Sequence, residues 1–438
     1  MASGNANAPL RIGVAGLGTV GASVVRIVRD RSAELERRTG SAFEIVAVSA
    51  RSRTKDRGVD VKLVDWYDDA VALAREAAID VFVELIGGED GPAKASVEAA
   101  LGRGVHVVTA NKALLAAHGA DLARKAEANG AALLFEAAVA GGIPAIKTLR
   151  EGLRANRIDS VYGVLNGTCN YILTRMEREG LPFGAVLRDA QDLGYAEADP
   201  TFDVGGFDTA HKLSLLAALA FGIEPDGSSV PCEGIEAITP EDIRTARELG
   251  YRIKLLGVAR ADGAAVDRRV HPALVPLEAS IAAVSGVTNA VGMRGDAVGE
   301  VFMSGPGAGG DATASAVIAD LCHVAIGAGG PVFGLSVDEL SPVHDPEPAP
   351  HEGGFYVRLT VHDRTGVFAS LAKHMADEGV SLRSIVQNEM KDGTDGRKSI
   401  VLVTHAVRED AVRRAVAAAE ADGNLTEPAH VMRIEPSF

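Results

Sequence analysis

Residues 10–30 read LRIGVAGLGTVGASVVRIVRD and decide the first part of the fold. A short apolar run precedes a G-x-G-x-x-G pattern and then apolar residues at helical spacing, which predicts a strand, a tight turn and a helix. Glycines let the backbone approach a pyrophosphate, and a helix N-terminus offers N–H groups to it. The pattern therefore predicts a dinucleotide site, with a plain structural turn as the alternative. The residues expected to contact the cofactor here are Gly16, Leu17, Gly18, Thr19, Val20 and Gly21.

Residues 10–146 continue this alternation of apolar runs and helical stretches. Such βαβ units build a parallel sheet with helices on both faces, so this segment is predicted to be a Rossmann domain. The second strand should end at SARSRTK, residues 49–55, where an NAD-selective site usually has an acidic residue. Cations there suit a 2′-phosphate and favour NADP over NAD, with Arg51 nearest the strand. A solvated basic loop is the alternative.

Two further predicted strands end in residues that should face the same cofactor. Ligands of open α/β sheets bind beyond the carboxyl ends of the strands. Ile86 and Gly87 follow one strand, and Thr109 and Lys112 follow another. Lys112 is placed to reach a phosphate or a substrate carboxylate; the alternative is a surface lysine.

The remaining chain divides into three parts. Residues 147–340 mix helical and strand-like runs, with helices expected over 146–154, 171–179 and 209–219, and are predicted to form an α+β domain. Residues 341–353 are proline-rich and are interpreted as a linker. Residues 354–438 show the order βαββαβ, which is typical of a ferredoxin-like domain. Residues 1–9 are expected to be a disordered leader.

The densest polar cluster lies in the second part, in the run QDLGYAEADPTFDVGGFDTAHK of residues 191–212. Glu197 and Asp203 fall in a Gly/Pro-rich loop. Asp208 and Lys212 are four residues apart at a helix start, so they share one face. A structural helix pair is the ordinary explanation, but the loop acids favour a site that binds an ammonium group and moves a proton. A lysine is a fair general acid near neutral pH and a poor base.

Three other segments carry candidate functional groups. Gly167 and Thr168 lie between a predicted strand and a helix and offer an amide and a hydroxyl to a carboxylate, while the adjacent Cys169 is interpreted as a packed residue. Glu136, followed by a Gly-Gly-x-Pro turn, could hold a small hard cation with backbone carbonyls or could be a metal-free hinge. A second glycine-rich loop at 304–310 precedes a helix and either closes over the cofactor or permits tight packing.

Composition excludes several classes of protein. The 438 residues include 44 Lys+Arg against 59 Asp+Glu, a net charge of −15 without a basic block, so no nucleic-acid partner is expected. The three cysteines have no disulfide or metal-ligand pattern. No apolar run is long enough to span a membrane and the N-terminus does not resemble a signal peptide, which predicts a cytoplasmic protein without membrane contact.

Together these segments resemble homoserine dehydrogenase over residues 10–330, and the tail from 354 resembles an ACT domain. The resemblance implies reversible NAD(P)H-dependent reduction of L-aspartate 4-semialdehyde to L-homoserine, in threonine, methionine and isoleucine biosynthesis. It implies the middle domain is catalytic and mediates dimerisation, in a homodimer or homotetramer. It also implies feedback regulation through the ACT domain, with threonine as a plausible effector.

The resemblance also assigns roles by residue. Lys212 would donate the proton and Asp208 would orient substrate or water. Two departures from the family pattern stand out: Pro306 where an arginine is frequent, and Thr365 where a proline usually precedes glycine. The implied substrate-binding residues are Glu197, Asp203, Thr168, Gly167, Tyr195 and Lys112. The second glycine loop would add Gly307 to the cofactor site, and a sodium ion would be held by Glu136 and the carbonyls of Val139, Gly141 and Ile143.

Two other functions remain open from the residues alone. One is a different NADP-dependent oxidoreductase acting on another amino-acid aldehyde or keto acid, which would leave the run from Glu197 to Lys212 unexplained. The other is a non-catalytic metabolite sensor that combines a Rossmann and an ACT module. The presence of Lys212, Asp208 and Glu197 together speaks against it.

Overall fold

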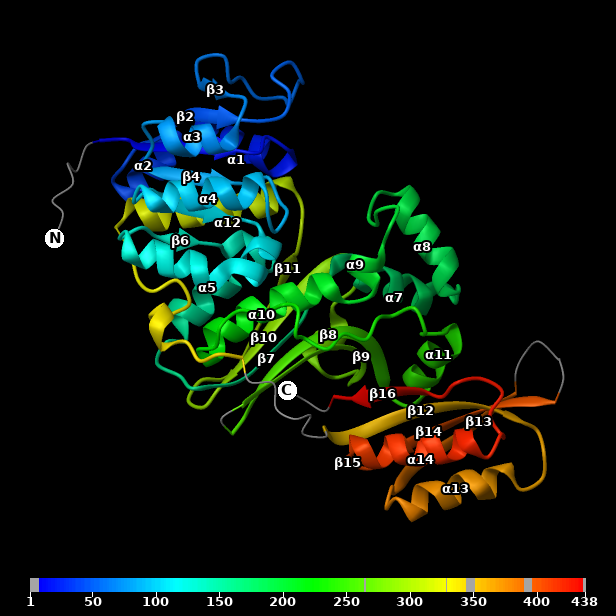
Figure 1. The fold of residues 1–438 in the computed structure, drawn as a ribbon. Coiled ribbons are helices and arrows are strands. Elements are labelled where there is room, and N and C mark those ends of the chain that lie inside the picture. The colour runs from blue at the N-terminus through cyan, green and yellow to red at the C-terminus, as the bar shows by residue number, and fades with distance from the viewer. Residues whose placement is uncertain (1–7, 264, 328, 344–350, 390–395, 436–438) are drawn as a thin grey trace.

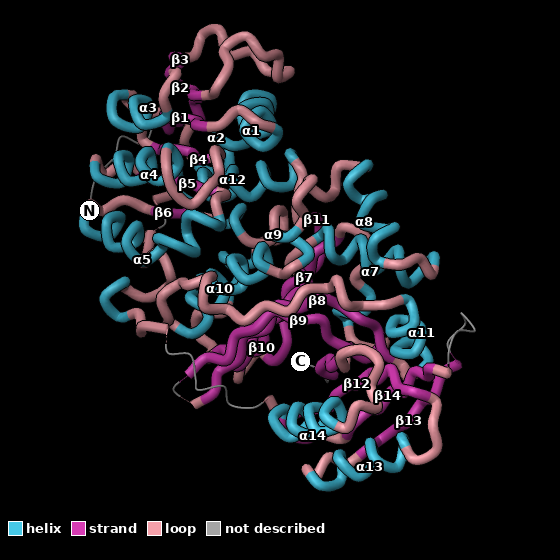
Figure 2. Tube along the Cα trace, turned by 45° about the vertical axis from the view of Figure 1, so that its right-hand side comes forward, coloured by secondary structure: helices cyan, strands magenta, loops and turns pink. Residues whose placement is uncertain are grey.

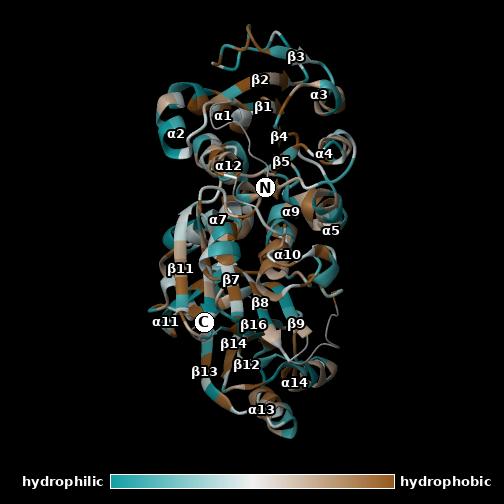
Figure 3. Cartoon of the chain, turned by 90° about the vertical axis from the view of Figure 1, so that its left-hand side faces the viewer, coloured by the Kyte–Doolittle hydropathy of each residue, from teal (hydrophilic) through white to brown (hydrophobic). Residues whose placement is uncertain are grey.

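The computed structural model describes residues 8–263, 265–327, 329–343, 351–389 and 396–435 (Figure 1). Most of the predicted leader and of the predicted linker lie outside these residues. The described chain forms two sheets. Figure 3 shows the first sheet above the second, with the helices α9 (Thr201–Val204) and α10 (Phe207–Phe221) between them.

The first sheet is parallel and has the strand order β3-β2-β1-β4-β5-β6. This is the order of a Rossmann fold, as the sequence predicted. Its strands are β1 (Leu10–Ala15), β2 (Phe43–Ser49), β3 (Asp65–Tyr67), β4 (Val81–Glu84), β5 (His106–Thr109) and β6 (Leu133–Leu134). Its helices are α1 (Thr19–Asp30), α2 (Ser32–Thr39), α3 (Ala70–Glu76), α4 (Pro92–Gly102) and α5 (Lys112–Ala128).

One helix of this layer comes from much later in the chain. The helix α12 (Gly310–Ala325) packs beside α1, and its buried residues Ala314, Val317 and Leu321 join the core of the first sheet. The strand β11 (Gly299–Pro306) leads into it, so the second glycine-rich loop lies where the chain returns to the first sheet.

The second sheet begins with the mixed α+β part of the chain. Its antiparallel strands β7 (Ile158–Val164), β8 (Tyr251–Asp262), β9 (Ala265–Pro276) and β10 (Thr288–Gly295) continue the order β11-β10-β7-β8-β9. The connecting helices are α6 (Ala145–Lys147), α7 (Gly167–Glu179), α8 (Phe183–Asp192), α9 (Thr201–Val204), α10 (Phe207–Phe221) and α11 (Pro240–Glu248). α7 begins at Gly167, earlier than predicted, because the Asn166 side chain accepts a hydrogen bond from the Cys169 N–H and caps the helix.

The C-terminal strands have the order β16-β12-β14-β13, which confirms the ferredoxin-like arrangement. Parallel pairing of β16 with β9 joins them to the second sheet. Figure 2 shows the strands β12, β14 and β13 below β8 and β9. The two modules therefore share one continuous sheet. The elements are β12 (Glu352–His362), α13 (Val367–Asp377), β13 (Leu382–Glu389), β14 (Arg397–Thr404), β15 (Val407–Arg408), α14 (Glu409–Ala421) and β16 (His430–Ile434).

Buried charges reinforce this junction. Glu435 follows β16 and is fully buried, with an Arg260 Nη2 to Glu435 Oε2 distance of 2.6 Å and a His271 Nε2 to Glu435 Oε1 distance of 3.3 Å. Burial alone would raise the pKa of Glu435, but His271 and Arg260 hold it well below its usual range. An ionised carboxylate is thus kept inside by partners from β8 and β9.

Candidate functional site

The first glycine turn is shaped to admit a ligand. Gly16 has a φ of +99°, and a Cβ there would lie 2.3 Å from the Leu85 carbonyl oxygen. A Cβ at Gly21 would lie 2.0 Å from the Gly16 carbonyl oxygen, so the turn needs glycine at both places. At Gly18 a Cβ would meet nothing within 4 Å, which leaves the N-terminus of α1 open. These features fit the pyrophosphate of a dinucleotide.

The basic loop after β2 folds back over this turn. Arg57 makes the connection: its Nε donates to the Leu17 carbonyl at 3.0 Å and its Nη2 to the Ser52 carbonyl at 2.6 Å. Arg57 and Arg53 also lie 5.8 and 6.0 Å from the ring centre of Trp66. Arg51 is exposed at the end of β2. Arg57 was not among the contacts predicted from the sequence, because no local pattern distinguishes it from its basic neighbours.

The carboxyl ends of β4 and β5 are tied together by Glu84. This buried side chain accepts hydrogen bonds from the N–H groups of Ile86 and Gly87 at 2.7 and 3.0 Å. Its other oxygen accepts from the Thr109 hydroxyl at 2.6 Å. The predicted cofactor residues Ile86, Gly87 and Thr109 are thus brought together by a residue to which the sequence analysis gave no role.

Lys112 stands at the start of α5, and Asn111 fixes that start. The Asn111 side chain caps the helix by accepting from the Leu114 N–H at 3.1 Å, and its amide donates to the Gly88 carbonyl at 2.7 Å. From there Lys112 Nζ reaches Asp208 Oδ1 at 3.2 Å. The lysine is therefore no simple surface residue, because it contacts the cluster on α10.

Asp208 and Lys212 form the centre of the site. Lys212 Nζ lies 2.6 Å from Asp208 Oδ2 and donates to the Leu165 carbonyl at 2.7 Å. The side chain of Lys212 is 12% exposed and that of Asp208 is 7% exposed. The Asn289 amide also donates to the Leu165 carbonyl, at 2.9 Å. The ammonium group is thus held between a carboxylate and a carbonyl whose position is itself fixed.

Asn166 links the two acids of the cluster. Its amide nitrogen donates to Asp203 Oδ1 at 2.7 Å and to Asp208 Oδ2 at 2.9 Å. Burial would raise the pKa of Asp208, but Lys212 and Lys112, with Asn166, hold it well below its usual range. Within the described part of the chain no cation lies in hydrogen-bond contact with Asp203, and burial together with Asp208 raises its pKa. The site therefore holds one firmly ionised acid beside one that protonates more easily.

The loop before α9 is the exposed side of the site. Thr168 donates its hydroxyl hydrogen to the Tyr195 carbonyl at 2.8 Å, and the Tyr195 ring lies 4.8 Å from that of Tyr171. Glu197 is exposed, and its backbone carbonyl accepts from Gln191. The structure thus gathers Asp203, Asp208, Lys212 and Lys112 directly, while Glu197 stays at the rim. Cys169 is buried, and burial raises the pKa of its thiol.

Glu136 is buried in the hinge between the two sheets. Its two carboxylate oxygens accept from the N–H groups of Ile146 and Lys147, each at 2.9 Å. Burial and the nearby Asp320 raise the pKa of Glu136 to about 7 against the opposing effect of these bonds. Among the described residues, no group of three or more His, Cys, Asp and Glu side chains is placed to hold a metal ion. Any cation here would therefore depend on backbone carbonyls.

The second glycine-rich loop packs on both the hinge and α1. The Gly142 N–H donates to the Pro306 carbonyl at 3.0 Å, and a Cβ on Gly141 would lie 2.4 Å from the Gly307 carbonyl oxygen. Asp311, next along, accepts from the Ser23 hydroxyl at 2.7 Å. The loop therefore lies between the predicted cation segment and the first turn of the cofactor helix.

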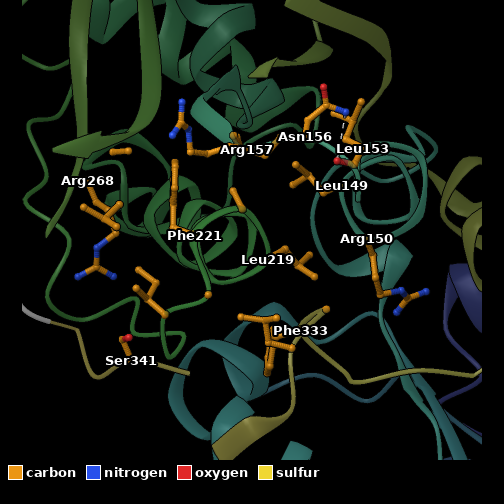
Figure 4. A pocket seen from close by; sticks show the side chains of 18 of the residues that line it. Leu149, Arg150, Leu153, Asn156, Arg157, Leu219, Phe221, Arg268, Phe333 and Ser341 are labelled. Atoms are coloured by element: carbon orange, nitrogen blue, oxygen red, sulfur yellow. Dashed lines mark hydrogen bonds between the residues drawn. The ribbon is translucent and has the colours of Figure 1, made fainter. Parts of the chain in front are cut away.

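A separate cavity of about 560 Å³ opens away from these residues. It lies beside β7, α10 and the chain after α12, and Figure 4 shows Phe221 and Phe333 among its lining side chains. Its Arg268 already donates to the Asp226 carbonyl and the Ser229 hydroxyl. None of the predicted site residues lines it.

Among the described residues, no helix is both long and apolar enough to cross a bilayer.

Family models match three successive parts of the chain. Residues 16–136 match the model described as homoserine dehydrogenase, NAD binding domain, and residues 144–322 match homoserine dehydrogenase. Residues 355–421 match the ACT domain. The matched segments follow the three structural parts described above.

Similar proteins match nearly the whole chain. A homoserine dehydrogenase of Pseudomonas aeruginosa is 43% identical, with 98% of this chain and 99% of the relative covered. The crystal structure of a homoserine dehydrogenase from Thiobacillus denitrificans is 41% identical with a TM-score of 0.92, covering 98% of this chain and 99% of that one. A hyperthermophilic archaeal homoserine dehydrogenase in complex with NADPH is 26% identical with a TM-score of 0.64, covering 74% and 99%.

Proposed function

The chain belongs to the homoserine dehydrogenase family, and from this premise we propose how its residues carry out the reaction. The enzyme is an oxidoreductase that reduces L-aspartate 4-semialdehyde to L-homoserine with NAD(P)H, reversibly. The observation that carries the proposed residue roles is the Lys212–Asp208 pair, which Lys112 connects to the cofactor-binding sheet.

Lys212 is the proton donor. When hydride from the reduced nicotinamide reaches the aldehyde carbon, negative charge develops on its oxygen. A cationic Nζ beside that oxygen stabilises the charge and then donates the proton. Asp208 keeps the ammonium in place at 2.6 Å, and the Leu165 carbonyl limits its direction. Asp208 therefore orients Lys212 as well as substrate or water.

The other polar groups bind the two ends of the substrate. Asp203, which the Asn166 amide ties into the cluster from α9, and Glu197, on the exposed loop before α9, receive the substrate ammonium. The Gly167 N–H at the start of α7 holds the carboxylate, together with the Thr168 hydroxyl, which would turn from the Tyr195 carbonyl to donate to it. Lys112 stands between this end and the nicotinamide.

The cofactor lies across the carboxyl edge of the first sheet. The proposed contacts are Gly16, Leu17, Gly18, Thr19, Val20, Gly21, Ile86, Gly87, Thr109, Lys112 and Gly307. Arg51 is exposed at the end of β2, and with Arg53 and Lys55 it favours the 2′-phosphate of NADP over NAD. Arg57 supports this preference by fixing the basic loop against the glycine turn.

A sodium ion is proposed at the hinge. The ion would be held by the buried carboxylate of Glu136 and by the carbonyls of Val139, Gly141 and Ile143, because oxygen donors suit a hard cation. Burial and the nearby Asp320 raise the pKa of Glu136, and a cation beside the carboxylate would favour its ionised form. The ion would stabilise the hinge between the two sheets, and no chemical step depends on it.

Regulation is proposed to act through the ACT domain, with threonine as effector. A cavity of about 700 Å³ lies where the C-terminal module meets β7 and β8. Arg383 on one side and Glu300 and Glu278 on the other suit the carboxylate and the ammonium of an amino acid. Titrating threonine into the assay tests this, and unchanged turnover at saturating threonine would exclude it.

Two broader properties are also proposed. The enzyme is a homodimer or homotetramer, which light scattering would measure. It works in the cytoplasm, a location supported by Cys169, Cys232 and Cys322, all of which are free thiols as in a reducing compartment.

One spectrophotometric assay tests the activity. The purified enzyme is mixed with aspartate semialdehyde and either NADPH or NADH, and the loss of reduced-cofactor absorbance is followed. We expect turnover with both cofactors to be saturable and NADPH to be preferred. Turnover of other aldehydes but not of aspartate semialdehyde would contradict the proposal. Binding of NADPH without any turnover would mean a sensor.

A further inference from the structure

A positively charged cavity lies against the second half of α7. It has a volume of about 480 Å³ and is lined by side chains from α7, α11 and β8. Four of these are cationic, Arg178, Arg247, Arg252 and Lys254, and only Glu177 is acidic. Such an excess is unusual in a chain whose net charge is −15.

Glu177 offsets only part of this charge. Arg247 Nη1 lies 2.6 Å from Glu177 Oε1, and Arg252 Nε lies 2.9 Å from Glu177 Oε2. The same carboxylate therefore serves two guanidinium groups. Within the described part of the chain Arg178 makes no ion pair, although it also lines the cavity.

Lys254 is the most unusual member of the group. Its side chain is 2% exposed, and its partners are neutral oxygens, Asn170 Oδ1 at 2.9 Å and the Val284 carbonyl. Burial, with Arg252 and Arg178 nearby, lowers the pKa of Lys254 to about 7. A buried ammonium without a carboxylate is costly unless an anion joins it.

We propose that this cavity binds a small phosphate-class anion. A phosphate group carries about −1.5 to −2 charges at neutral pH and several strong acceptor oxygens, so it offsets more of the surplus than one carboxylate would. Guanidinium groups on separate elements can approach such a tetrahedral anion from different directions. The volume is within the range of small-ligand sites.

Through Lys254, the anion site would also connect to the first turn of α7, where the proposed substrate-binding residues Gly167 and Thr168 lie. Lys254 holds Asn170, whose amide donates to the Thr288 carbonyl at 3.1 Å, and Asn170 lies in the first turn of the helix that begins at Gly167. An anion that keeps Lys254 charged therefore strengthens the support of that turn. Binding at this cavity does not depend on the proposed catalytic roles.

Isothermal titration calorimetry of the full-length protein tests the proposal. Inorganic phosphate is titrated at pH 7 against sodium chloride of matched ionic strength, and glycerol 3-phosphate is used as the phosphorylated-metabolite probe. We expect saturable binding of at least one probe. The Arg178→Gln variant should raise its Kd about tenfold, equivalent to about 1.4 kcal/mol. Lys254→Met should do so as well, provided that its circular dichroism matches the parent.

The matched control is Arg244→Gln, which removes an exposed arginine from α11 that does not line the cavity. Its Kd should equal that of the parent. Phosphate bound at the glycine turn would give the same heat in all variants. The proposal is overturned if neither probe binds, or if Arg178→Gln binds both as tightly as Arg244→Gln does.

Discussion

Lys112 at the start of α5 and Asp208 at the start of α10 form an ion pair, with Nζ and Oδ1 3.2 Å apart. This contact joins the cofactor-binding sheet to the catalytic cluster. Asp208 therefore lies between two lysines, because Lys212 holds its other oxygen at 2.6 Å. The pair places the proposed proton donor beside the carboxyl edge of the first sheet, where the cofactor is proposed to bind.

Replacing Lys212 by alanine should abolish most turnover. Loss of a positioned general acid costs about a hundredfold to ten-thousandfold in rate, whereas the glycine turn is untouched. We expect kcat to fall by that amount and the Kd of NADPH, measured by fluorescence, to stay nearly constant. Lys373→Ala, which removes an exposed lysine on α13, is the control. Near-normal turnover of the Lys212 variant would refute the role.

Asn166→Asp should separate positioning from chemistry. The new carboxylate keeps the oxygen that caps α7 but no longer donates to Asp203 and Asp208, and it adds a like charge. A hydrogen bond to a charged group is worth about 1.5–3 kcal/mol, so the loss of even one of the two predicts a fall in kcat/KM of roughly tenfold to a hundredfold. The acidic limb of the pH–rate profile should also shift to higher pH, because the added negative charge raises the pKa of the neighbouring acids. An unchanged profile and rate would mean that the amide has no part in positioning.

Arg51→Gln should reduce the preference for NADPH. If the guanidinium binds the 2′-phosphate, its removal costs about 1.4 kcal/mol, a tenfold rise in the KM for NADPH. The KM for NADH should hardly change, because that cofactor has a hydroxyl there. The two cofactors thus serve as each other's control. An equal change in the KM for NADPH and the KM for NADH would mean that Arg51 does not contact the 2′-phosphate and belongs to a solvated loop.

Glu136 should make stability depend on pH and on sodium. Its pKa in the folded state, about 7, is above the unfolded value of 4.5. The stabilisation associated with its proton is therefore fully present below pH 4.5 and is lost as pH rises through 7. We expect the unfolding midpoint to fall between pH 5 and 8 in choline chloride, and sodium chloride to restore it at pH 8.

Glu136→Gln should flatten this dependence and remove the sodium effect, although Asp320, whose pKa is also raised by burial, keeps part of the slope. Glu151→Gln, an exposed neighbour, should behave like the parent. If sodium raised the unfolding midpoint of the Glu136 variant as much as that of the parent, Glu136 would not be a ligand of the cation.

Glu435→Gln should destabilise the junction of the two modules. The carboxylate is buried against Arg260 and His271, and removing one member of a buried ionic cluster costs about 3–5 kcal/mol. Thermal unfolding should begin at a markedly lower temperature. Glu427→Gln, which removes an exposed partner of Arg397 at 3.5 Å, should cost less than about 1 kcal/mol. Equal midpoints for the two variants would contradict this.

The junction also affects how threonine regulation can be tested. Deleting residues 354–438 would remove β16 from its pairing with β9, expose the buried His271 and take the Glu435 carboxylate away from Arg260. A truncated enzyme would therefore lose stability as well as the ACT domain. Substitutions at Arg383, which lines the cavity between the modules, are the cleaner test.

The sequence by itself determined the Rossmann order, the ferredoxin-like tail and most of the candidate site. Periodicity and glycine spacing are local properties, so residues 10–30 sufficed to predict a strand, turn and helix. The pairing of Asp208 with Lys212 could be predicted because residues four apart in a helix lie on the same face. The family resemblance supplied the chemistry.

Only the tertiary structure decided which distant groups meet. Glu84 joins two strand ends, Asn166 bridges two acids, and Lys112 reaches α10. Each contact depends on elements far apart in the chain, and no local spacing encodes it. The same holds for the pKa values of Asp203 and Glu136, because burial and neighbouring charges set them and both arise only when the two sheets pack together.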